Sequence, residues 1–99
     1  AGKQLMLMLS FSRSNLAAAL AGEPPFDQSF LDWLRDKPYP VVDLRAAFRE
    51  DFAGSRAGID DYLEKFYNGH HSPAGNFFVA WALKDRICDW LDPKPLPYR

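Results

Sequence analysis

Residues 3–11 read Lys3-Gln4-Leu5-Met6-Leu7-Met8-Leu9-Ser10-Phe11. From Leu5 to Leu9 this stretch is apolar without alternation. That pattern is typical of a strand buried on both faces, as in a parallel sheet covered by helices. Such a strand needs neighbouring strands on both sides and helices on both faces. The stretch therefore predicts a layered α/β fold with residues 5–9 as a buried strand.

A helix is expected directly after this strand. Residues 12–15 offer hydroxyl and amide side chains that can cap a helix, and Leu16 to Leu20 is an alanine-rich helical run. Gly22 and the pair Pro24-Pro25 then end the run, because glycine favours a helix terminus and proline cannot continue one.

The segment from Phe26 to Lys37 predicts an amphipathic helix that Pro38 stops. Asp27 is expected to be its N-cap or to lie in its first turn. Charged residues fall on one side of this helix, and apolar residues recur at helical spacing on the other. The side chains expected to face the interior are Phe26, Phe30, Trp33 and Leu34.

A second strand is predicted from Val41 to Leu44, where β-branched residues follow Pro40. Asp43 is expected to cap the next helix, which runs from Arg45 to Phe52 and ends at Gly54. The order of strand, two helices, strand and further helices predicts a parallel sheet flanked by helices. Because two strands make a poor sheet, the chain is expected to be part of a larger domain or to be completed by another chain.

The last third of the chain predicts two helices around a turn. Ile59 to Tyr67 has one apolar side, and Asn68-Gly69 is a turn pair. Ser72 is expected to cap the final helix, with Pro73 as its first residue. This helix should end near Leu91. Its expected interior face consists of Phe77, Ala80, Trp81, Ile87, Cys88 and Leu91.

The domain organisation expected from these elements is simple. Residues 1–92 form a single α/β domain or the C-terminal part of a larger one, and residues 93–99 form a Pro-rich, extended tail. A chain that starts at Ala1 without an initiator Met is expected to carry a tag remnant or to be cut from a longer protein.

Composition narrows the possible partners. The chain has 99 residues, 12 basic and 13 acidic, with a formal charge of −1, so it lacks the basic surplus of a nucleic-acid-binding domain. No apolar run reaches the roughly 20 residues that span a bilayer. Cys88 is the only cysteine, which excludes an intrachain disulfide. Aromatic residues make up 15% of the chain, more than so small an interior holds, so some are expected to face a partner.

One motif carries most of the functional information. It reads Asn68-Gly69-His70-His71-Ser72-Pro73-Ala74-Gly75-Asn76 and leads into the last helix. The block resembles the C-terminal histidine block of SGNH (GDSL-like) hydrolases, where an Asp and then a His lie on a loop before the C-terminal helix. The resemblance implies a three-layer, flavodoxin-like fold, of which this chain would be the last third, and an ester hydrolase activity.

The resemblance also implies roles for individual residues. His70 takes the position of the catalytic His, and Asn68 stands where the Asp usually lies. An imidazole can accept the proton of a serine hydroxyl and return it to the leaving alcohol. Asn68 cannot supply the negative charge of an Asp, although its side-chain oxygen could orient the ring. Asp60 or Asp61 could take that role instead, or the acid could be missing.

The nucleophile that the family uses is not found. Ser10, Ser12 and Ser14 follow the first strand, but no Gly-Asp precedes them and no Gly-x-Ser-x-Gly elbow is present. The serine is therefore expected in a part of the domain absent from this chain, and substrate-binding residues are not identified. The alternative is a non-catalytic interaction or oligomerisation module in which His70 is a structural loop residue. No cofactor is implied, and His70-His71 lacks the further ligands of a zinc site.

Overall fold

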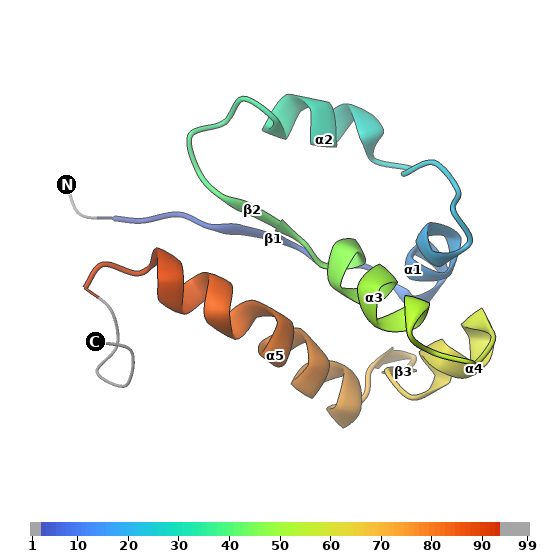
Figure 1. Cartoon of the computed structure of the whole chain (residues 1–99). Coiled ribbons are helices and arrows are strands. Elements are labelled where there is room, and N and C mark those ends of the chain that lie inside the picture. Colours follow the sequence, from blue (N-terminus) through green and yellow to red (C-terminus); the bar gives the residue numbers. More distant parts are fainter. Residues whose placement is uncertain (1–2, 94–99) are drawn as a thin grey trace.

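The computed structural model describes residues 3–93 and shows a mixed α/β fold (Figure 1). Beyond Pro93, the predicted Pro-rich tail lies outside the described residues. The helices and strands are, in chain order, β1 (Leu7–Leu9), α1 (Arg13–Leu20), α2 (Gln28–Leu34), β2 (Val41–Asp43), α3 (Leu44–Ala53), α4 (Ile59–Glu64), β3 (Tyr67–Asn68), β4 (His70–His71) and α5 (Pro73–Trp90).

Strands β1 and β2 form a parallel pair, as the sequence predicts. Leu7 lies opposite Val41 and Leu9 opposite Asp43. The chain crosses from one strand to the other through α1 and α2, because parallel neighbours need a long connection. In Figure 1 the pair lies between α2 on one side and α5 on the other. This arrangement confirms a parallel sheet flanked by helices.

The hydrophobic core lies where α1, α3, α4 and α5 meet, beyond the end of the parallel pair. Each of these helices contributes apolar side chains that are buried or packed on the buried cluster. The buried members are Leu16, Leu44, Phe48, Tyr62, Leu63, Phe66 and Tyr67. From the sheet, Val42 is buried, but the prediction of a buried strand over residues 5–9 is wrong, because β1 spans only Leu7–Leu9 and both Leu5 and Met8 are exposed. The core thus stabilises the helical end of the molecule and leaves β1 partly bare.

The predicted interior face of α2 is wrong. Only Leu34 is buried, whereas Phe26, Phe30 and Trp33 are exposed, Phe26 by 70%. The rings of Phe30 and Trp33 stack on each other with their centroids 5.9 Å apart. Helical periodicity identifies an apolar face correctly, but burial also requires something for that face to pack on. Within residues 3–93 this face meets only the ring of Phe11, which lies edge-on to Phe26, and the ammonium of Lys37 over Trp33, so it stays largely exposed.

The predicted interior face of α5 is also wrong in part. Phe77 and Trp81 are exposed, by 72% and 57%, and Ile87 is exposed as well. The side chains that pack on the core are Phe78, Val79, Ala82 and Leu83. Residues 77–83 are apolar without interruption, so their periodicity does not select one face of the helix. The position of α3 decides which face is covered.

Arg45 is the buried polar centre of the fold. Its side chain is 3% exposed and meets two carboxylates: Nη1 donates to Asp27 Oδ1 at 2.8 Å and Nη2 to Asp43 Oδ2 at 2.7 Å. The guanidinium also lies 4.2 Å from the centre of the Phe11 ring. Hydrogen bonding to Asp43 raises the pKa of Arg45 above its ordinary value, although burial opposes the shift. One side chain thus joins the segment before α2, the end of β2, α3 and the residues after β1.

Of the two aspartates that bind Arg45, only Asp43 also caps a helix. Asp43 accepts a hydrogen bond from the Arg45 backbone N–H at 3.0 Å and caps α3, as expected. Asp27 occupies the N-cap position of α2 but makes no capping hydrogen bond there. Its carboxylate is committed to the guanidinium instead, which shows that tertiary pairing has overridden the local capping preference.

The predicted helix ends around α1 are confirmed. Ser12 accepts a hydrogen bond from the backbone N–H of Asn15 at 3.3 Å. At the other end, Gly22 has a φ of +82°, and the N–H of Glu23 donates to the carbonyl of Ala18 at 3.0 Å. This left-handed glycine terminus closes α1 and turns the chain toward α2. No helix within residues 3–93 is long and apolar enough to cross a membrane.

Replacing Arg45 with Ala should lower the free energy of unfolding by about 3 kcal/mol, because Asp27 and Asp43 would keep their charges without a buried partner. Urea unfolding followed by circular dichroism measures this. Arg49→Ala is the matched control, since Arg49 is exposed on the same helix and should change stability by no more than about 0.5 kcal/mol. Equal stability of the two variants would contradict a central role for Arg45.

Tyr62 should make the protein sensitive to alkaline pH. Burial, together with a hydrogen bond that its hydroxyl donates to Asp51 Oδ2 at 2.7 Å, raises the pKa of Tyr62 well above its ordinary value. The unfolded chain releases this proton near pH 10 while the native state keeps it, so stability falls as pH rises past that point.

Urea titrations at pH 8 and pH 11 should therefore show a smaller loss of stability for Tyr62→Phe than for the unaltered protein. At pH 8 the variant should be less stable by about 1 kcal/mol, because it lacks the hydrogen bond to Asp51. The same pH dependence in both proteins would show that Tyr62 does not contribute to it.

Candidate functional site

The histidine block folds as a tight antiparallel hairpin between α4 and α5. Tyr67 pairs with His71 and Asn68 with His70 across the turn at Gly69. Gly69 has a φ of +76°, a left-handed conformation that side chains other than glycine rarely adopt. The predicted Asn68-Gly69 turn is confirmed. The two-residue strands around it are not apparent from the sequence, which favours a helix up to Tyr67.

Tyr67 fastens this hairpin to the end of β1. Its buried hydroxyl donates a hydrogen bond to the carbonyl oxygen of Phe11 at 3.0 Å, and burial raises the pKa of Tyr67. Phe11 follows β1, so the histidine hairpin lies beside the carboxyl end of that strand. Sequence reasoning assigned Tyr67 to an apolar helix face and missed this role, because the two residues are 56 positions apart.

Ser72 fixes the start of α5, as predicted. Its hydroxyl oxygen accepts a hydrogen bond from the Gly75 N–H at 3.1 Å and donates one to the Lys65 carbonyl at 2.7 Å. The Ser72 N–H in turn donates to the Phe66 carbonyl at 2.9 Å. The first turn of α5 is therefore held against the chain that leaves α4.

Gly75 lies where α5 touches this chain most closely. It is buried, and a Cβ at this position would overlap the carbonyl oxygen of Phe66. Only a residue without a side chain lets the helix approach its neighbour this closely. Gly75, the second glycine of the histidine block, thus has a packing function that the structure explains.

His70 is exposed at the tip side of the hairpin. Its Nδ1 lies 3.3 Å from the carbonyl oxygen of His71. A carbonyl can only accept, so a neutral ring in this arrangement carries its proton on Nδ1 and leaves the lone pair of Nε2 free to accept one. Solvent can reach the imidazole, and a backbone carbonyl orients it.

No carboxylate contacts His70 within residues 3–93. The backbones of Asn68 and His70 are paired, yet no hydrogen bond joins their side chains in this part of the chain. Asp60 and Asp61 lie in the first turn of α4, and the carbonyl of Asp60 accepts from Arg13 Nη2 at 3.2 Å. The structure therefore brings none of these candidate acids to the imidazole.

His71 is a packing residue. Its ring lies over that of Tyr67, with the centroids 4.7 Å apart, and is half-buried. It also borders an open cleft that it shares with Ser10 and Met8 of the first strand segment and with side chains of α5. Of the two adjacent histidines, His71 faces this cleft and His70 faces solvent.

The three serines after β1 have ordinary surroundings. Ser12 is occupied as the cap of α1, and its hydroxyl lies 3.2 Å from that of Ser14. Ser10 is exposed and borders the same cleft as His71, but it makes no hydrogen bond to a histidine among the described residues. In residues 3–93 no three His, Cys, Asp or Glu residues gather in a way that could hold a metal ion.

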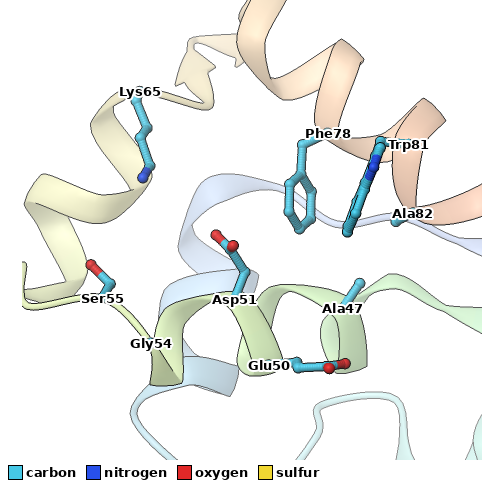
Figure 2. Close-up of a pocket in the computed structure, with 9 residues that line it drawn as sticks. All are labelled: Ala47, Glu50, Asp51, Gly54, Ser55, Lys65, Phe78, Trp81 and Ala82. Carbon is cyan, nitrogen blue, oxygen red and sulfur yellow. The ribbon is translucent and has the colours of Figure 1, made fainter.

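A second cleft, of about 620 Å³, opens between α3, α5 and the end of α4. Figure 2 shows Phe78 and Trp81 projecting from α5 toward α3, where Asp51 and Glu50 lie. The Asp51 carboxylate already accepts from Tyr62, and the Lys65 ammonium lies 4.8 Å from the centre of the Tyr62 ring. No residue of the histidine hairpin lines this second cleft, so the cleft is separate from the candidate site.

Comparisons with known proteins add no family assignment. No family model matches the sequence, and neither the curated proteins nor the solved structures contain a match. The candidate site is therefore defined by its own residues: an exposed imidazole on a fastened hairpin, next to the carboxyl end of β1.

Replacing Gly75 with Ala should lower the free energy of unfolding by about 2 kcal/mol, because the added methyl group would push α5 away from Phe66. Gly54→Ala is the control, since Gly54 has a φ of −87° and a Cβ there meets only an ordinary contact with Asp51. Thermal unfolding of both variants provides the comparison. A Gly75→Ala protein as stable as the control would show that the close approach is not required.

Proposed function

We propose that this chain is the C-terminal, histidine-bearing part of an SGNH-like ester hydrolase. His70 is the general base, Asn68 stands in the position of the usual acid, and the serine nucleophile belongs to a part of the polypeptide outside these 99 residues. The substrate class is an ester, such as an acyl or acetyl group on a carbohydrate or a lipid.

The observation that carries the proposal is the setting of His70. The ring is exposed on a hairpin immediately before α5, and Tyr67 holds this hairpin beside the carboxyl end of β1. In open α/β sheets, substrates bind outside the carboxyl ends of the strands. In this proposal, an imidazole on the hairpin at that edge accepts the proton of a hydroxyl presented by a neighbouring strand.

The proposal also assigns a fold to the larger domain. A three-layer, flavodoxin-like domain would contain β1 and β2 as two of its parallel strands, with α2 and α5 on opposite faces. The parallel register of β1 and β2 and the helices on both sides are compatible with it. In this interpretation residues 3–93 supply two strands of a larger sheet.

The chemistry assigned to the site needs only proton transfer from this chain. Nε2 of His70 would accept the proton of the serine hydroxyl as that oxygen attacks the ester carbonyl, and would then return it to the leaving alcohol. The carbonyl of His71 holds Nδ1–H, a task that a carboxylate performs in a Ser-His-Asp triad. Because a carbonyl is neutral, it stabilises the imidazolium less than a carboxylate would.

A specific observation favours a second candidate, a non-catalytic interaction or oligomerisation module. The aromatic face of α2, formed by Phe26, Phe30 and Trp33, is exposed, and so are Phe77 and Trp81 on α5. Soluble monomers rarely expose so many large apolar side chains together. In that case His70 would stabilise the hairpin and would take no part in catalysis.

Hydrolysis of p-nitrophenyl acetate by the full-length protein tests the first candidate. His70→Ala should lower kcat/KM by about 10³-fold, the usual contribution of a general base. His71→Ala is the matched control, because its imidazole is adjacent in sequence but packs on Tyr67, and it should keep activity within about tenfold.

Equal rates for the full-length protein and its His70→Ala form would end the hydrolase proposal and favour the interaction module. The 99-residue chain by itself should show no acyl-enzyme burst, because a base without its nucleophile gives little rate. A burst from this chain would instead place the nucleophile among its own serines.

A further inference from the structure

The turn of the histidine hairpin brings an asparagine carboxamide next to the backbone nitrogen of a glycine. Asn68 and Gly69 are both exposed, and nothing lies within 4 Å of the place where a Cβ of Gly69 would be. Neither the Asn68 carboxamide nor the Gly69 N–H makes a hydrogen bond to another group within residues 3–93. Both groups are therefore available to react with each other.

These two groups can combine in a reaction within the chain. The Gly69 nitrogen loses its proton and attacks Cγ of Asn68, the bond from Cγ to Nδ2 breaks, and Nδ2 leaves as ammonia with that proton. The product is a succinimide ring. Water then opens the ring: cleavage of the new Cγ–N bond gives aspartate, and cleavage of the original peptide bond gives isoaspartate. Because the reacting groups belong to adjacent residues, ring closure needs no second protein and no cofactor.

The other two asparagines of the chain lack this freedom. The nitrogen that follows Asn15 belongs to Leu16, and its N–H already donates to the Ser12 carbonyl at 3.0 Å. Asn76 lies inside α5, where the N–H of Phe77 belongs to the helical hydrogen-bond ladder. A bulky side chain also follows each of these asparagines. The reaction is therefore favoured in the hairpin turn and not at the two helical positions.

Ring closure requires the tip of the hairpin to open. Only the pairs Tyr67 with His71 and Asn68 with His70 join the two strands. So short a pairing opens at a small free-energy cost. The hydroxyls of Tyr67 and Ser72 fasten the base of the hairpin to the chain after β1 and to the end of α4. The turn can therefore open while its base stays in place.

A carboxylate at position 68 would lie beside the imidazole of His70. Asn68 and His70 are directly opposite each other in the antiparallel pair, so their side chains leave the same face with Cβ atoms about 5 Å apart. The ring of His70 is held only by the neutral carbonyl of His71, 3.3 Å from Nδ1. A negative charge opposite the ring would favour its protonated form.

We propose that Asn68-Gly69 is a self-modification site, at which Asn68 converts to aspartate through a succinimide and places a carboxylate opposite His70. Of the two products, aspartate alone keeps the backbone length that the paired hairpin needs. The modification stands on the geometry of the turn, whereas its consequence for catalysis rests on the proposed function. The new carboxylate would stabilise the imidazolium that forms when His70 accepts a proton.

Peptide mass spectrometry of the 99-residue chain, incubated at neutral pH, tests the proposal. Asn68 should convert from amide to acid while Asn15 and Asn76 in the same sample keep their amides. The folded chain should yield mainly aspartate and should gain one negative charge over its formal −1, which anion-exchange chromatography detects. Equal conversion of all three asparagines, an unchanged Asn68 or isoaspartate as the main product would overturn the proposal.

Asn68→Gln is the matched control for the chemistry. Glutamine keeps the carboxamide, but its longer side chain has to close a larger ring, which forms far more slowly. The variant should therefore keep its mass and charge over the same incubation. Conversion of this variant at the rate of the unaltered chain would contradict the succinimide route.

Asn68→Asp introduces the product directly and tests where its charge lies. In nuclear magnetic resonance spectra at neutral pH, the ring protons of His70 should shift toward the protonated form relative to their positions in Asn68→Gln. The exposed position allows both variants to fold, and circular dichroism checks this. Identical His70 resonances in two folded variants would show that the carboxylate does not act on the ring and would overturn its assigned place.

The two proposals fail in different ways. Conversion of Asn68 in a protein whose ester hydrolysis does not depend on His70 would keep the modification site and remove the enzyme. Hydrolysis that depends on His70, with an unchanged Asn68, would keep the enzyme and remove the modification site.

Discussion

The buried guanidinium of Arg45 is the constraint from which the arrangement of the strands follows. It meets the carboxylates of Asp27 and Asp43 and lies over the ring of Phe11, so four segments that are distant in sequence converge on one cation. A buried charge is tolerated only when its partners are in place. The crossover through α2 therefore has to return to the end of β2, and β1 has to finish beside it.

This ionic centre lies at the boundary between a well-packed and a bare part of the molecule. On one side, Phe48, Tyr62 and Phe66 pack with their ring centroids 5.1–5.5 Å apart. On the other side, the β1–β2 pair has helices on both faces but an open edge at Met8. The helical core stabilises the molecule, and the parallel pair contributes few buried side chains to it.

The histidine hairpin is joined to both parts. Tyr67 contributes its ring to the core and its hydroxyl to the end of β1, and Ser72 and Gly75 fix the start of α5 against the chain leaving α4. His70 itself is free of this packing. A rigid support with an exposed imidazole suits the proposed role of His70 as a base that acts on a group presented by another segment.

Local features were determined by the sequence alone: the two strands, the caps at Ser12, Asp43 and Ser72, and the Asn68-Gly69 turn all follow from short-range geometry. The tertiary structure decided what depends on distant partners. Asp27 pairs with Arg45 instead of capping α2, Tyr67 reaches Phe11, and α3 selects which face of the apolar α5 is covered. Periodicity can mark an apolar face, but burial requires a neighbour, and neighbours are set by the whole chain.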